Sequence, residues 1–310
     1  MSIAFVFPGQ GAQTIGMGRA LAEAYPAAKA VFDEVDEALG ENLSGLIWDG
    51  DIEALTLTEN AQPALMATSI AAVRALEAEG ISLDRVSYVA GHSLGEYSAL
   101  AAAGAFTISD TARLLRTRGL AMQQAVPVGQ GAMAAILGLD FDTVTDVAEK
   151  AAQGQVCQVA NANDPAQNVV SGDKDAVERA TVLAKDAGAK RALLLPVSAP
   201  FHCALMAPAA EEMEKALGTV TVQAPRVPLV ANVIAEAVSD PERIKRLLVQ
   251  QVTGQVRWRS SVEWMANNGV TEFWEIGAGK ALTGMIRRIA KDAQTRNVGT
   301  ADDIKAALEA

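Results

Sequence analysis

The first half of the chain alternates short apolar runs with longer helical patterns. Residues 3–7 and 86–90 are apolar runs of strand length, and each is followed by a glycine-containing turn. An alanine-rich helical pattern ends at Tyr25, and two more cover 63–79 and 110–122. Short buried strands that alternate with helices are typical of a parallel α/β sheet. We therefore predict an α/β fold for this part of the chain.

The pattern changes after Pro127. The predicted elements then follow in the order β-α-β-β-α-β, with strands at 131–139, 156–161, 168–171 and 191–197 and helices at 141–152 and 176–187. This is the order of a ferredoxin-like unit. Beyond Pro196 and Pro200 the α/β alternation resumes, with strands near 229–232 and 272–276. We predict a discontinuous larger domain at 1–127 and 196–310 and an inserted ferredoxin-like subdomain at 128–195.

Composition argues against several classes of protein. The chain has 26 Lys and Arg against 37 Asp and Glu, a net charge of −11, so general nucleic-acid binding is not expected. No apolar run reaches transmembrane length and no basic segment precedes the first apolar run, so neither a membrane partner nor a signal peptide is expected. Cys157 and Cys203 lack metal or redox spacing. We expect a cytoplasmic protein with reduced thiols, no metal and no cofactor.

The turn after residues 86–90 has the most specific pattern in the chain. It reads Gly91-His92-Ser93-Leu94-Gly95 and lies between a predicted strand and a helix of small residues. In this context G-x-S-x-G predicts a nucleophile elbow, whose sharp turn exposes the serine Oγ. The glycines let the backbone pass closely, and the helix N-terminus directs N–H groups at a developing oxyanion. The alternative is an ordinary turn whose serine caps the helix.

A serine nucleophile needs a neighbouring base, and the chain has two histidines. His92 adjoins Ser93, where successive side chains diverge, so we expect it to point back into the structure. His202 lies in a loop between a predicted strand and a predicted helix, the place where an open α/β sheet puts its site. We predict His202 as the base. The alternative is a half-buried loop histidine with a structural role.

The sequence does not identify the group that orients the imidazole of His202. Hydrolases with this motif place an Asp or Glu between the serine and the histidine in the chain. The acidic candidates are Asp140, Asp142, Asp164, Asp173 and Asp175, all inside the predicted insert. Nothing in the sequence chooses among them, and a backbone or amide carbonyl could serve instead.

One arginine falls on an apolar helix face. In the predicted helix 110–122, Arg118 shares a face with Leu114, Leu115 and Met122 by helical spacing. A buried guanidinium needs an anionic partner, and its planar fork fits a carboxylate. Two interpretations stay open, an internal ion pair with Glu96 and a clamp for a substrate carboxylate.

The glycine-rich segment 9–14 is not a nucleotide motif. It has Thr14 where a dinucleotide fingerprint needs its third glycine, and no Gly-Lys-Ser/Thr follows. The loop could instead offer a backbone N–H to an oxyanion together with that of Leu94. The alternative is a tight turn.

Taken together, these segments resemble the malonyl-CoA:acyl-carrier-protein transacylases of fatty acid synthesis. The likeness covers nearly the whole chain, and its matched segments are 5–13, 91–96, 118–119, 160–163, 200–203, 251 with 256–258, and 275–279. Several motifs in one order are more specific than the pentapeptide alone. The resemblance implies an α/β-hydrolase-like catalytic core with a ferredoxin-like insert.

The resemblance also implies a mechanism and its partners. Ser93 would take the malonyl group from malonyl-CoA and pass it to the phosphopantetheine thiol of acyl carrier protein. His202 would be the base, held by the main-chain carbonyl of Gln251 rather than by an acid. Relatives often have serine or proline in the stretch after Gln251, where this chain has Thr253-Gly254-Gln255.

Further site residues follow from the same likeness. The backbone N–H groups of Gln10 and Leu94 would form the oxyanion hole, and Arg118 would bind the malonyl carboxylate. Asn161 belongs to a matched segment and is expected at the substrate. Phe201 stands where malonyl-specific members carry phenylalanine and methylmalonyl-selective ones usually carry serine.

Two rival functions remain. A serine esterase or thioesterase would pass the acyl group to water, and a non-catalytic scaffold would keep only the fold. The inward Arg118 and the lack of a clear acid disfavour the first. For the carrier protein, which is expected to be acidic, docking is expected at local basic groups, namely Lys190 with Arg191, and Arg287 with Arg288 and Lys291. The alternative for these groups is solvated surface charge.

Overall fold

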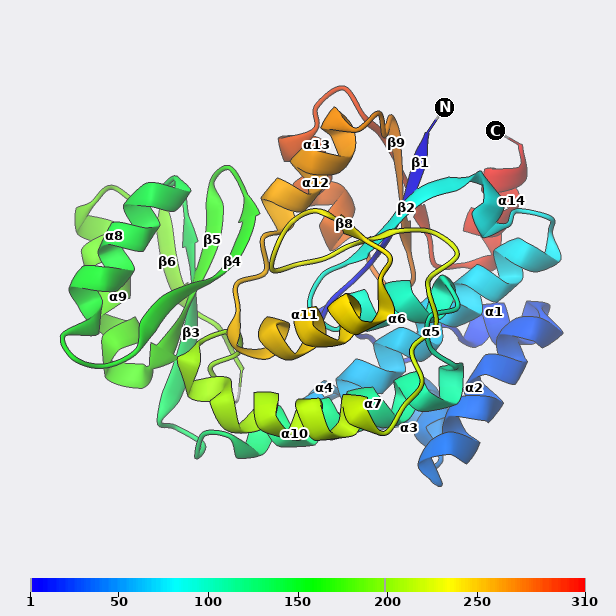
Figure 1. The fold of residues 1–310 in the computed structure, drawn as a ribbon, viewed down its shortest axis with the longest axis horizontal. Coiled ribbons are helices and arrows are strands. Elements are labelled where there is room, and N and C mark those ends of the chain that lie inside the picture. The colour runs from blue at the N-terminus through cyan, green and yellow to red at the C-terminus, as the bar shows by residue number, and fades with distance from the viewer. Residues whose placement is uncertain (1, 198, 310) are drawn as a thin grey trace.

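Two β-sheets lie side by side in the computed structural model, which describes residues 2–197 and 199–309 (Figure 1). The larger sheet has the strand order β10-β9-β1-β2-β7-β8. Its strands are β1 (Ile3–Phe7), β2 (Val86–Gly91), β7 (Leu229–Val230), β8 (Ala237–Val238), β9 (Glu272–Ile276) and β10 (Gln294–Val298). All pairs are parallel except β7 with β8. The α/β prediction is confirmed, and the sheet is mixed at one edge.

The larger sheet is buried on both faces because its strands are apolar on both. Along β1, Phe5 and Phe7 face one side, whereas Ala4 and Val6 face the other. Helices α5 (Thr58–Ala78) and α6 (Gly95–Ala102) pack on the Phe5 side. Helices α12 (Trp258–Asn267) and α13 (Ala281–Ile289) cover the opposite side. The elbow between β2 and α6 therefore lies over a sheet fixed from both sides.

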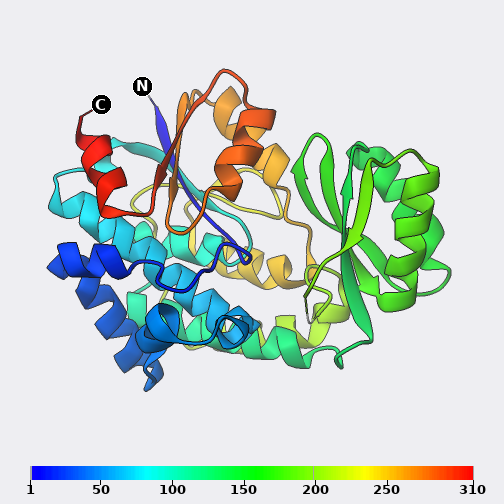
Figure 2. The same cartoon turned by 180° about the vertical axis from the view of Figure 1, so that it is seen from behind.

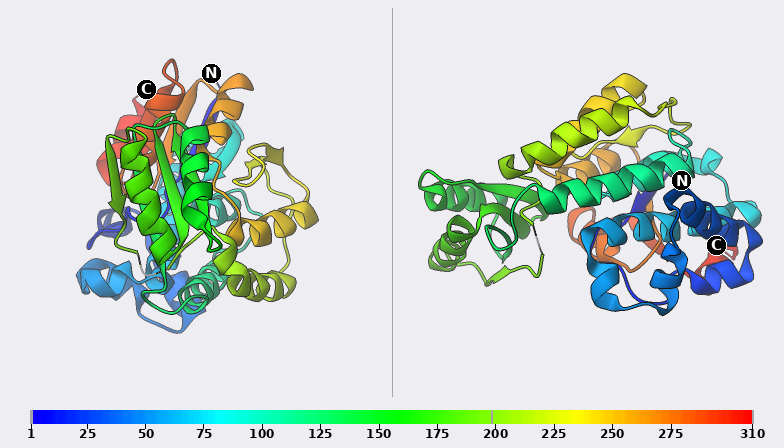
Figure 3. Two further views of the ribbon diagram at one scale, coloured as in Figure 1. Left: turned by 90° about the vertical axis from the view of Figure 1, so that its left-hand side faces the viewer. Right: turned by 90° about the horizontal axis from the view of Figure 1, so that it is seen from below.

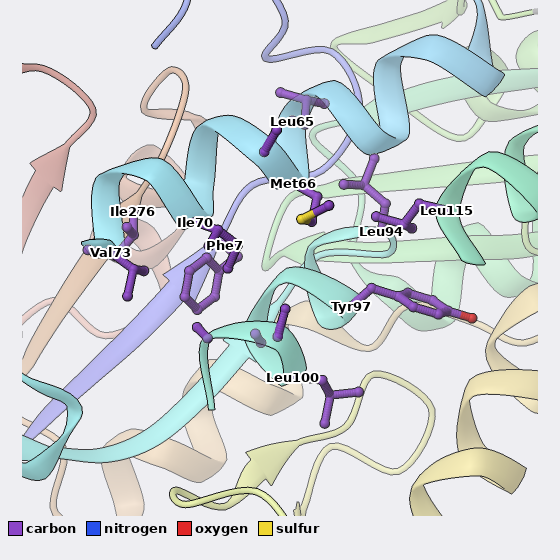
Figure 4. Close-up of a cluster of buried hydrophobic side chains, with 14 of the residues drawn as sticks. Phe7, Leu65, Met66, Ile70, Val73, Leu94, Tyr97, Leu100, Leu115 and Ile276 are labelled. Atoms are coloured by element: carbon purple, nitrogen blue, oxygen red, sulfur yellow. The ribbon is translucent and has the colours of Figure 1, made fainter. Parts of the chain in front are cut away.

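Helix α5 is the centre of the main core. Figure 4 shows Leu65, Met66 and Ile70 of this helix above Phe7 of β1 and Tyr97 and Leu100 of α6. Nearly every residue of α5 after its first turn is buried, so it is apolar on all sides rather than on one stripe.

Helix α5 begins five residues before the predicted start at Pro63. Proline lacks the N–H that would bond the carbonyl four residues earlier, which is that of Glu59. Arg116 Nη1 donates to this carbonyl at 2.9 Å. The helix therefore continues through Pro63 because a side chain from another helix satisfies the free acceptor.

The other helices of the larger unit frame this core. The first part of the chain adds α1 (Arg19–Ala24), α2 (Pro26–Leu39), α3 (Leu43–Asp49) and α4 (Ile52–Thr56). The later helices are α7 (Ile108–Gln124), α10 (Ala207–Gly218), α11 (Pro241–Thr253) and α14 (Ala301–Leu308), with short 3-10 turns η1 (Leu83–Arg85) and η2 (Ala204–Met206). Helix α14 packs on α1 and α5, and both chain ends lie on that side of the molecule (Figure 2).

The smaller sheet is antiparallel and has the order β4-β5-β3-β6. Its elements are β3 (Gly131–Leu137), α8 (Phe141–Ala152), β4 (Cys157–Asp164), β5 (Gln167–Asp173), α9 (Lys174–Asp186) and β6 (Arg191–Leu194). Helices α8 and α9 cover one face and form a separate apolar core with it. The predicted element order is confirmed, with ends that differ by a few residues. Residue 198, just after the predicted last strand, lies outside the described residues.

Two helices and one strand contact join the sheets. The chain leaves the larger unit through α7 and returns into α10, and these helices pack along each other (Figure 3). Near the site, Val256 donates to Ala160 O at 2.8 Å and accepts from Ala162 N at 3.0 Å. These bonds fix β4 of the smaller sheet against the larger unit, so the two sheets present a common cavity.

Within residues 2–197 and 199–309, no helix is long and apolar enough to cross a membrane.

Candidate active site

Ser93 lies at a sharp, strained turn between β2 and α6. Its φ of 54° is in the left-handed region, which non-glycine residues rarely adopt. The turn needs its glycines, because a Cβ on Gly91 would lie 1.9 Å from Gly95 O and one on Gly95 would lie 2.2 Å from Phe7 O. Leu94 is the N-cap of α6, and the serine side chain does not cap the helix. The geometry is that of an elbow, and the capping alternative is wrong.

The Ser93 hydroxyl meets His202. Ser93 Oγ lies 2.7 Å from His202 Nε2, and His202 Nδ1 lies 2.9 Å from Gln251 O. Since a carbonyl only accepts, Nδ1 carries the proton and Nε2 is free to take the serine proton. Burial, and next the charge of Arg118, lower the pKa of His202 to about 3. The imidazole is thus neutral and oriented as a base.

A helix end supplies the acceptor that an acid supplies in a triad. Gln251 lies in the last turn of α11, where carbonyls have no partner inside the helix and the helix dipole is negative. Its carbonyl can therefore hold the Nδ1–H and stabilise an imidazolium. The acidic candidates of the insert lie elsewhere; Asp140 caps α8, and Asp164 pairs with Arg288.

His202 reaches Ser93 by a route that the sequence did not predict. The strand before it, β6, belongs to the smaller antiparallel sheet, where the predicted element order had put it, so the general rule for sites at strand ends of an open α/β sheet does not apply to His202. His202 lies instead on the segment that returns from the smaller sheet toward α10. Its φ of 59° is also left-handed, and its side chain is buried.

Arg118 is fully buried beside the serine. Its Nη1 donates to Gln62 Oε1 at 2.7 Å, and its Nη2 donates to Ser93 Oγ at 3.1 Å and to Gln251 Oε1 at 2.8 Å. Among the described residues no carboxylate lies within ion-pair distance, so the predicted alternative of an ion pair with Glu96 is not formed. A buried guanidinium without an anionic partner is suited to bind an anion that arrives from outside.

The loop after β1 approaches the elbow closely. His92 N donates to Phe7 O at 3.0 Å, and a Cβ on Gly9 would lie 2.8 Å from His92 O. Gln10 and Leu94 line the same cavity as Ser93. Neither of their backbone N–H groups has a protein acceptor in the part of the chain that the structure describes. Two free donors therefore lie at the serine.

A cavity of about 450 Å³ opens above Ser93 between the two sheets. Asn161 and Val169 line it from the smaller sheet, and Phe201 lines it next to His202. His92 also lines it, where its Nε2 lies 2.9 Å from Asn163 Oδ1. Burial lowers the pKa of His92. The structure thus brings the predicted site residues to the wall of one cavity, except Gln251, which lies behind them in contact with His202 and Arg118.

Sequence reasoning missed several residues at the site, among them Gln62, Asn232 and Glu96. Asn232 follows β7, and its Oδ1 accepts from Ser93 N at 2.9 Å. Glu96 is buried beneath the elbow, and burial raises its pKa to about 7. Glu96 was considered only as a partner for Arg118, and nothing local marks Asn232, which lies 139 residues from Ser93 in the chain.

Comparison with known proteins gives the family. The acyl transferase domain model matches residues 4–307. The chain belongs to the acyl transferase family. This acyltransferase is 47% identical over 308 residues to the malonyl CoA-acyl carrier protein transacylase of Bacillus subtilis, with 99% of this chain and 96% of the relative covered. The resemblance found in the sequence is confirmed.

Solved structures agree with this acyltransferase in fold. The acyl-carrier-protein S-malonyltransferase of Bartonella henselae has a TM-score of 0.98 at 58% identity, covering 100% of this chain and 99% of that one. The same comparison with the structure of a type II PKS acyl-carrier protein in complex with its malonyl-transacylase gives a TM-score of 0.97 at 42% identity. It covers 100% of this chain and 99% of the matched chain.

Proposed function

We propose that Ser93 and His202 of this acyltransferase transfer a malonyl group in two steps. The protein moves the malonyl group of malonyl-CoA to the phosphopantetheine thiol of acyl carrier protein, as its relatives' names state for them. The position of Ser93 Oγ is the observation that supports these residue roles. Ser93 Oγ lies 2.7 Å from a neutral imidazole nitrogen and 3.1 Å from a guanidinium that has no carboxylate partner within the described residues.

In the first step Ser93 attacks the thioester carbonyl of malonyl-CoA. His202 Nε2 takes the hydroxyl proton as the Oγ–C bond forms, and the N–H groups of Gln10 and Leu94 receive the oxyanion. The C–S bond then breaks, and the proton on His202 passes to the sulfur. Coenzyme A leaves as the thiol and a malonyl-serine ester remains.

In the second step the carrier thiol gives its proton to His202 and its sulfur attacks the ester. The same two N–H groups hold the oxyanion, the C–O bond breaks, and His202 returns the proton to Ser93 Oγ. The Gln251 carbonyl stabilises the imidazolium in both steps, which explains how the site works without an aspartate.

Three residues account for selection of the acyl group. The Arg118 guanidinium binds the malonyl carboxylate, a charge-assisted hydrogen bond worth about 1.5–3 kcal/mol. Phe201 is nearly buried and fills space next to His202, which disfavours a branched acyl group. Asn161, on β4, contributes a polar group to the cavity wall.

The fold fits the finer architecture that the sequence suggested. We infer an α/β-hydrolase-like catalytic domain over 1–127 and 196–310, supported by the elbow between β2 and α6. We infer a ferredoxin-like subdomain over 128–195, supported by the strand order β4-β5-β3-β6 with two helices on one face.

Mass spectrometry of the intact protein tests the proposal. After mixing with malonyl-CoA, we expect one malonyl adduct that maps to Ser93, persists in buffer and disappears on addition of holo-acyl carrier protein. Ser93→Ala is the matched control and should carry no adduct. Rapid multi-turnover hydrolysis of malonyl-CoA without a lasting adduct would favour the thioesterase, and unchanged transfer by Ser93→Ala would exclude Ser93 as the nucleophile.

A further inference from the structure

Glu96 is a buried acid that the reaction does not use. It is the second residue of α6, directly beneath Ser93, and only 1% of its surface is exposed. Its Oε2 accepts two hydrogen bonds, from Gln251 Nε2 at 2.9 Å and from Asn232 N at 3.1 Å. Its Oε1 has no partner within the described residues. Burying a carboxyl group costs free energy, so its presence beneath the elbow needs an explanation, and its two hydrogen bonds suggest one.

The first of these partners contacts His202 and Ser93 at once. The Gln251 carbonyl accepts from His202 Nδ1 at 2.9 Å. Its side-chain Nε2, which Glu96 binds, also donates to Ser93 O at 2.9 Å. Gln251 therefore connects the base to the backbone of the nucleophile, and the position of its amide depends on Glu96.

The second partner holds the elbow from below. Asn232 Oδ1 accepts from Ser93 N at 2.9 Å, and Asn232 Nδ2 donates to Gly91 O at 2.7 Å. These bonds stabilise the strained turn on both sides of the serine. The backbone N–H of Asn232 is the donor that Glu96 binds. One carboxyl oxygen thus anchors both groups that fix the elbow.

We propose that Glu96 is a positioning residue for the reaction. Through Gln251 and Asn232 it sets the distance and alignment between Ser93 Oγ and His202 Nε2. This inference rests on the proposed roles of Ser93 and His202. If a nucleophile and its base are displaced by about 1 Å from the reactive geometry, the rate of the chemical step falls by on the order of 100-fold.

Because of this hydrogen-bond pattern, three substitutions can separate the positioning role of Glu96 from the effects of its carboxyl charge and from its effect on folding. Because a single oxygen takes both bonds, the amide of Glu96→Gln can make them with its own oxygen and place its NH₂ where Oε1 lies. Glu96→Asp keeps the carboxyl but withdraws its oxygens by one methylene. Glu96→Leu keeps the volume and removes both bonds.

The experiment measures the pre-steady-state rate of Ser93 acylation by malonyl-CoA, with kcat and KM, in the full-length protein. We expect Glu96→Leu to acylate about 100-fold more slowly, with KM changed by less than about threefold, because the cavity is intact. Glu96→Asp should fall by about tenfold or more, and Glu96→Gln should stay within about fivefold of the original protein.

Glu272→Leu is the matched control. Glu272 is likewise a buried carboxylate, at the first residue of β9, and it pairs with Arg296 rather than with the site. Its loss should lower the melting temperature without slowing acylation. This variant shows what a destabilised but correctly arranged protein does, so a general stability effect at Glu96 would be recognised.

A second readout uses the fact that the chain has only two histidines. In ¹⁵N-histidine NMR spectra, His202 should be held as the Nδ1–H tautomer in the original protein and in Glu96→Gln. In Glu96→Asp and folded Glu96→Leu, the His202 signals should move toward the tautomer mixture of a free imidazole.

The outcomes decide the matter even if Glu96→Leu does not fold, since Glu96→Asp and Glu96→Gln then carry the test. Acylation by Glu96→Asp or Glu96→Leu at the original rate would overturn the positioning role. So would an equal loss in Glu96→Gln and Glu96→Asp. Failure of the original protein to form the malonyl-serine adduct would overturn the proposed function instead.

Discussion

Arg118 Nη2 lies 3.1 Å from Ser93 Oγ, so the only charge in direct contact with the nucleophile is a cation that no protein carboxylate neutralises within the described residues. Under the proposed function, the acid that this cation binds is the carboxylate of the malonyl group. Its position also influences the base, because the charge of Arg118 contributes to the low pKa of His202. We therefore expect one side chain to affect both donor selection and the protonation state of the imidazole.

Replacement of Arg118 should change the acyl preference of the site. We expect Arg118→Ala to lose about 10- to 150-fold in malonyl transfer, the value of one charge-assisted hydrogen bond, and to lose much less in acetyl transfer. Acylation rates with malonyl-CoA and acetyl-CoA measure the difference. Arg118→Lys is the control that keeps the charge without the planar fork. An equal loss with both donors would contradict the clamp.

The pH dependence of acylation should show a base that stays neutral in mild acid. His202 must be unprotonated to accept the serine proton, so activity is lost as pH falls through its pKa. Because burial lowers this pKa to about 3, the acid limb of kcat/KM should lie far below pH 6.5. Acetyl-CoA is the suitable donor, since it has no carboxylate that titrates. In Arg118→Ala the limb should move to higher pH. A limb near pH 6.5 in the original protein would contradict the assignment.

Carrier docking is expected at basic groups of α13, a helix that contributes residues to the cavity wall. Arg287 lies on α13, where Met285 lines the cavity, and its Nε donates to Thr295. Arg287→Glu should raise the KM for holo-acyl carrier protein several-fold, more at low than at high salt, and leave the KM for malonyl-CoA nearly unchanged. Arg288 is a poorer choice because reversal would also break its pair with Asp164. Lys150→Glu, on α8, is the control, because Lys150 is exposed and has no ion pair within the described residues. An unchanged carrier KM would remove this patch from consideration.

The sequence predicted the fold where a local pattern decides it. Most strands follow from short apolar runs, but β8, which has two residues, and β10, which reads Gln-Thr-Arg-Asn-Val, were not predicted. Helix α8 was predicted at its observed bounds, 141–152, and the structure shows a local reason for them: Asp140 caps the helix, and its apolar positions recur on one face. The start of α5 could not be predicted, because it depends on Arg116 reaching a carbonyl from another helix. Such long-range compensation leaves no local trace.

The residues of the site also fall into two groups, those that a local pattern predicts and those that it does not. Ser93, the glycines of the elbow and Arg118 are recognisable by spacing, because a turn and a helix face are local features. The supporting residues are not, since Asn232 and Gln251 act through contacts 139 and 158 residues from Ser93 in the chain. A backbone carbonyl, such as that of Gln251, has no residue type that would reveal it. Here it was suggested only by the family resemblance.

The stability of the protein should depend on pH through Glu96. Burial raises the pKa of this carboxyl from 4.5 to about 7, so below pH 4.5 it is protonated in both the folded and the unfolded chain, and its contribution to stability is fully present. As pH rises toward 7 the unfolded chain ionises while the folded one resists, and stability is lost. The loss amounts to about 3 kcal/mol.

Urea unfolding of the original protein and of Glu96→Gln, measured between pH 4.5 and 8, isolates this loss. The amide does not titrate, and all other groups are shared, so they cancel in the difference between the two free energies of unfolding. Relative to Glu96→Gln, the original protein should lose about 3 kcal/mol between pH 4.5 and 7 and little more above that range. A difference that stays constant over this range would mean that the folded protein holds Glu96 with an ordinary carboxyl pKa. The same measurement would then show that Arg118 and the two hydrogen bonds on Oε2 stabilise the ionised form as much as burial opposes it.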